Sequence, residues 1–265
     1  MSSLRNLMLF PIIVMVLSGI AGSYAHSGEK IVCYSLSHAV QLDGKWTTAE
    51  EWIDAAEVST AAVCIRVKHD EARMYVLIDH VADPQIDRSP SINEGDLCWI
   101  YADPNHDGGE KLQPDDYGFG ARWAAQTLTL MMAKGAGGNW TMMAPISGFE
   151  ARSSSDQSTN PKTTSPHVSY ELSIPKYIIA NPTVGARFSV RDGAKGVFRQ
   201  WPIQSRPIEP DTWADLEFSA LPIGEFSMSQ LPLIALICLS VTTFFLKIPP
   251  RRSSARPGRP MGETS

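Results

Sequence analysis

The chain has 265 residues, 43% of them hydrophobic, with 23 Lys and Arg against 28 Asp and Glu. Setting aside Arg5, the five cations after residue 246 and Glu263 leaves a central part with 17 positive and 27 negative charges, long enough for one domain with its own core. That acidic balance excludes nucleic acid as a partner, because phosphates need a basic surface, and it is compatible with cations such as calcium.

The N-terminal end has the order of a secretory signal. Arg5 precedes an apolar run, Leu7–Leu17, and small residues follow, with Ser23 and Ala25 at the spacing that signal peptidase requires. The run is short for a membrane span, which needs about 20 residues. The sequence therefore predicts cleavage after Ala25, leaving His26 as the new N-terminus; the alternative is an uncleaved N-terminal anchor.

The central part is dominated by alternation of apolar and polar residues, which is typical of β-strands. Short strands separated by Gly, Pro, Asp and Asn predict an all-β fold, an antiparallel β-sandwich of the jelly-roll or immunoglobulin-like kind. One short helix is expected over Thr47–Ala56, because Thr47 and Glu50 form a capping box. The strands expected are 63–68, 74–78, 97–101, 127–133, 168–174 and 187–191.

The C-terminal end predicts one transmembrane helix with a basic tail. Leu231–Leu246 carries no charge and is extended by Ile248, enough for a tilted span. The cations behind it favour a cytoplasmic tail, so the chain is expected to be a single-pass cell-membrane protein with an extracellular ectodomain. The alternative is a buried core helix at the end of the domain. The expected organisation is signal peptide 1–25, leader 26–40, β-sandwich 41–220, linker 221–230, transmembrane helix 231–248 and cytoplasmic tail 249–265.

Three cysteines lie outside the predicted span. Cys33, Cys64 and Cys98 could form one disulfide and leave one thiol, or all three could be buried and free; their spacing matches no zinc motif. Asn139 begins the sequon Asn-Trp-Thr, a candidate glycosylation site on an exported domain.

A set of short motifs, read in order over Gln41–Ser219, resembles the carbohydrate-binding module family 9-like domains within the DOMON-like β-sandwiches. The resemblance implies a β-sandwich and a glycan or cell-envelope polymer as partner, and the family also includes haem binders. The segment 221–226 looks like the Pro-Glu-Phe sorting signals of archaeal surface proteins, although Ile and Gly separate its Pro from its Glu. The motifs are Asp43-Gly44-Lys45-Trp46 with Glu51-Trp52, 74–78 with Asp83, 95–103, 115–119, 170–175, Trp201-Pro202 and 213–218.

An acidic loop has the D-x-N-x-D-G form of a calcium loop, because oxygen ligands on alternate residues can converge on one ion. Its twelfth position is Pro114, so it is not an EF-hand, and an acid from the far end of the loop would have to close the site. The alternative is an Asx-rich turn without metal. The candidate calcium ligands are Asp103, Asn105, Asp107, Asp115 and Asp116.

Sugar binding uses flat aromatic rings, and binding residues concentrate near loops. Trp46, Trp52 and Trp213 belong to the framework motifs and are expected in the core. Haem is not expected, because the methionines at 131, 132, 142 and 143 read as core filler and no C-x-x-C-H is present. The candidate carbohydrate-binding residues are Trp99, Trp123, Trp140 and Trp201.

No catalytic motif stands out, so the protein is not expected to be an enzyme. An N-terminal His26 resembles the copper-binding amino terminus of polysaccharide monooxygenases, but that site needs a second positioned histidine, and the simpler expectation is a disordered leader. The function expected is non-catalytic carbohydrate binding at the cell surface. The alternatives are a structural or adhesive envelope protein without a small ligand and, third, a haem or redox domain.

Overall fold

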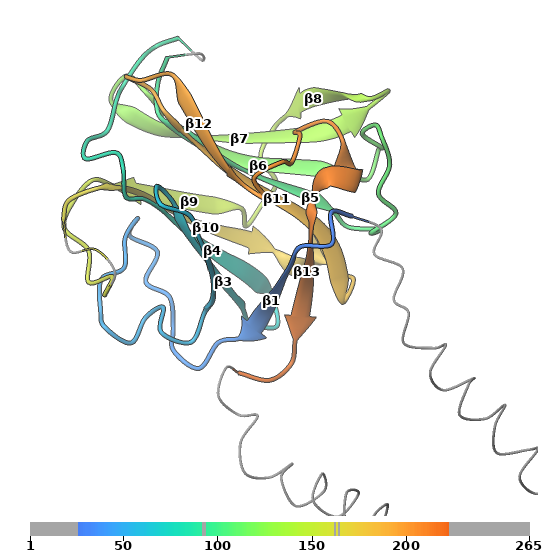
Figure 1. Cartoon of the computed structure of the whole chain (residues 1–265), viewed down its shortest axis with the longest axis horizontal. Coiled ribbons are helices and arrows are strands. Elements are labelled where there is room, and N and C mark those ends of the chain that lie inside the picture. Colours follow the sequence, from blue (N-terminus) through green and yellow to red (C-terminus); the bar gives the residue numbers. More distant parts are fainter. Residues whose placement is uncertain (1–25, 92–93, 162, 164, 223–265) are drawn as a thin grey trace, which may run out of the picture. The chain divides into compact units, whose positions relative to one another are not determined.

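The computed structural model describes residues 26–91, 94–161, 163 and 165–222 (Figure 1). This part of the chain is built from β-strands, with two three-residue 3-10 turns, Lys176–Ile178 and Pro210–Thr212. The strands are β1 Lys30–Ser35, β2 Ala56–Ser59, β3 Cys64–His69, β4 Arg73–His80, β5 Leu97–Asp103, β6 Tyr117–Ala124, β7 Thr127–Ala136, β8 Asn139–Met143, β9 Glu150–Ser154, β10 Val168–Pro175, β11 Thr183–Asp192, β12 Val197–Trp201 and β13 Ala214–Ser219.

The strands form one continuous hydrogen-bonded sheet in the order β8-β7-β6-β5-β11-β13-β1-β3-β4-β10-β9, with β12 on β11 and β2 on β3. Every pairing is antiparallel except those of β1, which runs parallel to both β13 and β3. The expectation of a wholly antiparallel sandwich is corrected at this strand. β1 also lies within the expected leader 26–40, so the sheet begins at Lys30 rather than after the boundary at Gln41.

The sheet folds back on itself into two layers, with β5, β6, β7 and β11 facing β3, β4, β9 and β10 (Figure 1). Alternate side chains from both layers fill one core, as in a β-sandwich. The rings of Phe119 and Phe149 meet edge to face at 5.4 Å between centroids, and Trp123 Nε1 donates to Ser153 Oγ at 3.1 Å across the layers. The all-β fold predicted from the alternation is confirmed.

The helix expected over Thr47–Ala56 is wrong. The segment runs as successive turns, and Glu51, not Glu50, binds the free backbone groups: its carboxylate accepts from Thr47 N at 2.8 Å and from Gln41 N at 2.6 Å. The fully buried Lys68 crosses under the segment and donates to Asp54 Oδ1 at 2.8 Å and to the Glu51 carbonyl. Glu51 of the segment itself and Lys68 of β3 therefore satisfy polar groups of the segment that are not paired in a helix.

Of the alternatives for the cysteines, the structure has three buried free thiols at Cys33, Cys64 and Cys98. Burial raises the pKa of Cys64 to about 11 and that of Cys98 to about 12, so both are thiols at neutral pH.

The described residues contain no helix long and apolar enough to cross a membrane. The predicted signal peptide 1–25, the predicted span 231–248 and the tail 249–265 lie outside the described residues.

Candidate functional site

The outer face of β5 carries two aromatic side chains. Because Cys98, Ile100 and Ala102 point into the core, the alternation of the strand turns Trp99 and Tyr101 outward. Trp99 lies flat over β6 because that strand has glycines beneath it. A Cβ at Gly120 would lie 2.7 Å from Trp99 Cε3, so a larger residue there would displace the indole.

A groove of about 580 Å³ opens over β5, β11 and β12, beneath the loop that follows β12. Its apolar wall is aromatic, and Phe198 is 54% exposed. Its polar wall comes from β11 and β12, whose alternation brings every second residue to the same face. The lining residues are Leu97, Trp99, Tyr101, Arg187, Ser189, Arg191, Phe198, Gln200 and Pro207.

The aromatic wall continues as a row of rings. Trp99 stacks on Tyr101 with centroids 5.8 Å apart and planes 19° apart, and Tyr101 lies 5.2 Å from Trp140. Trp140 is in turn parallel to the buried Trp213 at 6.4 Å. Trp140 Nε1 donates to the Pro207 carbonyl at 2.9 Å, which fixes the row against the loop. The stacked pair of Trp99 and Tyr101, called the Trp99–Tyr101 platform below, is therefore held in place by contacts within the protein.

Two arginines form the polar wall. Arg187 donates to Gln200 Oε1 at 2.7 Å and lies 5.0 Å from the Tyr101 ring centre, while Arg191 lies 5.6 Å from that of Phe198. The Nε of each arginine is buried without a hydrogen-bond partner. Among the described residues, no carboxylate lines the groove. The groove is thus an aromatic-walled site with two cationic side chains on an acidic chain.

The four tryptophans proposed for sugar binding separate in the structure. Trp99 lines the groove, and Trp140 lies beside it in the aromatic row. Trp201 is 7% exposed and packs on Phe188 in the core, and Trp123 packs between the layers, so neither reaches the groove.

Three polar residues of the groove were not among the predicted binding residues, although their spacing in the sequence indicates a shared face. Arg187, Ser189 and Arg191 alternate with core residues along β11, so a period-two reading places them together on the outer face.

The acidic loop brings together three of the five proposed calcium ligands. Carboxylate oxygens of Asp103, Asp107 and Asp115 lie within 4.8 Å of one another, and Asn105 is exposed. Asp116 is buried beside them and accepts from Gln113 N at 2.6 Å; burial, with the neighbouring acids, raises the pKa of Asp116 to about 7.

Asp103, however, is already occupied by protein donors. Its Oδ1 accepts from His106 N at 2.8 Å and its Oδ2 from Gly108 N at 2.8 Å, as in an Asx turn. Although burial raises the pKa of Asp103, the hydrogen bonds from His26, Gly108 and His106 hold it below its usual value.

A second carboxylate cluster was not predicted. Asp83, Asp87, Asp96 and Asp192 place carboxylate oxygens within 4.8 Å of one another, and all but Asp87 are buried. Burial, together with Asp96 and Asp192, raises the pKa of Asp83 to about 7, and burial raises that of Asp96 to about 6. Asp83 Oδ2 is buried without a hydrogen-bond partner. These acids follow β4, precede β5 and end β11, so only the fold brings them together.

Asn139 begins β8 and is exposed, and its glycosylation stays a prediction.

No protein-family model and no curated protein sequence matches the chain. Two solved structures that are similar to it show a family 9 carbohydrate-binding module from Caldicellulosiruptor kristjanssonii, one in complex with glucose and the other with cellotriose. The glucose complex is 14% identical, with a TM-score of 0.48, and the match covers 71% of this chain and 96% of that chain. The cellotriose complex is 14% identical, with a TM-score of 0.49, and the match covers 76% of this chain and 96% of that chain.

Proposed function

We propose that this protein is a non-catalytic carbohydrate-binding module whose ligand occupies the groove over β5, β11 and β12. The observation that carries the proposal is the fixed Trp99–Tyr101 platform facing two arginines and an amide in one groove. A pyranose has an apolar face that packs on an aromatic ring, and hydroxyl groups around its edge that pair with guanidinium and amide groups.

The charge of the groove favours an acidic sugar. Arg187 and Arg191 both line the groove, and none of the described residues that line it is an acid. A planar guanidinium pairs with a carboxylate through two parallel hydrogen bonds, which a neutral sugar cannot offer. A uronic acid in a surface or envelope polysaccharide is therefore the ligand class that this groove suits best.

The proposed place of action is the cell surface. The apolar N-terminal run and the uncharged C-terminal run with its basic tail support export and tethering by a single span. Such tethering would hold the groove near envelope polymers.

Calcium is proposed as a structural ion at the cluster of Asp83, Asp87, Asp96 and Asp192. Four carboxylates provide the oxygen donors that calcium prefers, and a bound cation would relieve their mutual repulsion. The loop of Asp103, Asp107 and Asp115 is the second candidate, because Asp107 is exposed and Asp103 Oδ2 is shared between Gly108 N and His26 Nε2.

The test is calorimetric titration of the purified protein with acidic and neutral oligosaccharides. We expect saturable binding of uronic-acid oligomers, a loss of at least tenfold in affinity for Trp99→Ala and for Arg187→Gln, and no change for Tyr177→Ala, an exposed aromatic outside the groove. An absence of saturable binding across the panel would favour the structural or adhesive alternative.

A further inference from the structure

The residues before β1 are tied to the sheet. Ser27 N donates to the Trp213 carbonyl at 2.8 Å, and Asp215 N donates to the Glu29 carbonyl at 2.8 Å. These bonds carry His26 to the start of β13, where its side chain is fully buried. The expectation of a disordered leader fails here, and the position of His26 needs an explanation of its own.

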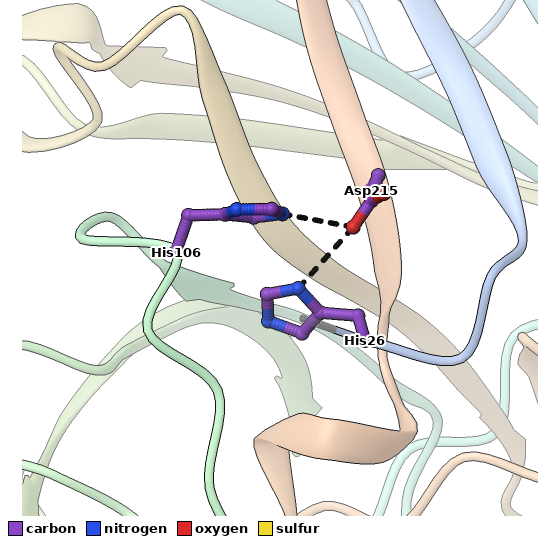
Figure 2. Close-up of side chains that lie close together, drawn as sticks. All are labelled: His26, His106 and Asp215. Atoms are coloured by element: carbon purple, nitrogen blue, oxygen red, sulfur yellow. Dashed lines mark hydrogen bonds and ion pairs between the residues drawn. The ribbon is translucent and has the colours of Figure 1, made fainter. Parts of the chain in front are cut away.

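His26 lies in a cluster with His106 and Asp215 (Figure 2). The two imidazole rings are 4.4 Å apart between centroids. His106 Nε2 lies 2.8 Å and His26 Nδ1 lies 3.2 Å from the same carboxylate oxygen, Asp215 Oδ1. Figure 2 shows both nitrogens pointing at that oxygen from the loop and from the N-terminal segment. The residues thus come from three segments far apart in the sequence and converge on one point.

The hydrogen bonds around His26 leave one of its nitrogens unpaired. Asp103 Oδ2 lies 3.1 Å from His26 Nε2, and a carboxylate assigns the ring proton to that nitrogen. Nδ1 then presents a lone pair toward the oxygen of Asp215, and it is buried without a hydrogen-bond partner. Two electron-rich atoms at this distance repel each other unless a proton or a metal ion lies between them.

The surroundings are shaped to hold this arrangement. A Cβ at Gly185 would lie 2.4 Å from His26 Nε2, so glycine leaves the space that the ring occupies. Asp103 also accepts from the backbone N–H of His106 at 2.8 Å, and so it positions both histidines. A carboxylate that orients a ligating histidine through its other nitrogen is the usual outer support of a metal site.

We propose that His26, His106 and Asp215 bind a divalent transition-metal ion, with copper(II) bound most tightly. Two imidazoles and one carboxylate are donors for late transition metals rather than for calcium, which prefers oxygen alone. Among divalent metals, a given nitrogen and oxygen site favours copper(II) in the Irving–Williams order. The site is separate from the proposed sugar groove, of which none of these residues is a part.

Export would complete the site. If signal peptidase cuts after Ala25, the backbone nitrogen of His26 changes from an amide into an amine, which is a metal donor. That amine and Nδ1 belong to the same residue and can close a six-membered chelate ring on the ion. Metal affinity is then coupled to maturation, since the precursor lacks the fourth donor.

The test is copper titration of the exported full chain, extracted in detergent and stripped with EDTA, followed by metal analysis and electron paramagnetic resonance. We expect one copper per chain with nitrogen hyperfine structure, and a loss of at least tenfold in affinity for His106→Ala and Asp215→Asn. His38→Ala is the matched control, because His38 is exposed and lies outside the cluster. Asp215→Asn keeps the shape of the side chain, and its unfolding midpoint separates lost ligation from lost folding.

Two outcomes overturn the proposal. If copper binds no better to the parent protein than to the folded Asp215→Asn variant, the cluster holds a proton and not a metal. Ala25→Tyr, which blocks the small-residue cleavage signal, tests the amine: we expect mass spectrometry to show residues 1–25 retained and copper affinity at least tenfold weaker. Equal affinity of the cleaved and uncleaved chains would remove the amine from the site.

Discussion

The cluster of Asp83, Asp87, Asp96 and Asp192 makes a sharp prediction about pH, cations and stability. The pKa of Asp83 rises from 3.8 to about 7 on folding, first because of burial and then because of Asp96 and Asp192. Keeping Asp83 ionised in the folded state at pH 8 therefore lowers the free energy of unfolding by on the order of 4 kcal/mol, because one pKa unit corresponds to about 1.4 kcal/mol. Because the carboxylates of the cluster titrate together, this free-energy cost belongs to the whole cluster, and no separate cost is added for Asp96.

The sign follows from linkage. Because the folded pKa of Asp83 lies above the unfolded value, its contribution to stability is fully present below pH 3.8 and is lost as the pH rises through about 7. Asp83→Asn removes the charge and keeps the shape. Without divalent cations at pH 8, the variant is expected to unfold at a midpoint on the order of 10 °C above the parent, since 1 kcal/mol corresponds to roughly 2–4 °C in a domain of this size. The difference should shrink as the pH falls through 7.

The assay is thermal unfolding at pH 5 and pH 8 in EDTA, repeated with millimolar calcium. Calcium should raise the midpoint of the parent at pH 8 by mass action and raise that of Asp83→Asn less, because a ligand has been lost. Asp156→Asn is the control, since Asp156 is exposed and outside the cluster. Burial lowers the pKa of His80 to about 4, which opposes the trend, and His80 Nδ1 lies 3.6 Å from Asp83 Oδ2. The two proteins are therefore compared at pH 8, where His80 is neutral in both the folded and the unfolded state. If Asp83→Asn is no more stable than the parent at pH 8 in EDTA, the repulsion inferred from the cluster is refuted.

Three further predictions test the packing. Gly120→Ala should displace the Trp99 indole, lower stability by roughly 1–3 kcal/mol and weaken binding of acidic sugars, as thermal unfolding and calorimetry would show. Lys68→Met should lower stability by roughly 3–5 kcal/mol in urea unfolding, because Asp54 loses the partner that satisfies its buried charge. Cys98 should resist iodoacetamide at pH 8 until the protein is unfolded, since it is buried and its pKa is raised to about 12; rapid labelling of the folded chain, detected by mass spectrometry, would contradict its placement.

The strands predicted at 63–68 and 97–101 appear as β3, Cys64–His69, and β5, Leu97–Asp103. The alternation of apolar and polar residues indicated β3 correctly, but it did not predict that the polar residues Arg66 and Lys68 are also buried, each in an ion pair. β6 was missed because Gly118 and Gly120 weaken the strand signal, and these glycines are needed for Trp99 to lie on the strand. The helix expected at Thr47–Ala56 is absent, and Lys68 from β3 donates instead to the Glu51 carbonyl and to Asp54, a long-range contact that no local rule contains.

Whether a site could be predicted from the sequence depends on how many segments of the chain contribute to it. Residues that share a strand, such as Arg187 and Arg191, can be grouped by spacing alone. Clusters assembled from three or four segments cannot, because their members meet only through the order of strands in the sheet. The histidine cluster depends on β1, because the parallel placement of β1 beside β13 brings His26 to Asp215. The predicted domain began at Gln41, so it left out β1 and this contact.

Asp103 links the acidic loop to the histidine cluster, and its bonds decide what the loop does. One of its oxygens accepts from the His106 N–H, and the other accepts from Gly108 N and lies 3.1 Å from His26 Nε2. An oxygen already shared by two protein donors is a poor calcium ligand, since the ion would have to displace them. The D-x-N-x-D-G form is therefore better explained as a turn that aims His106, at a φ of 54°, toward Asp215. The motif that suggests calcium in the sequence therefore positions His106 for the metal site proposed at His26, His106 and Asp215.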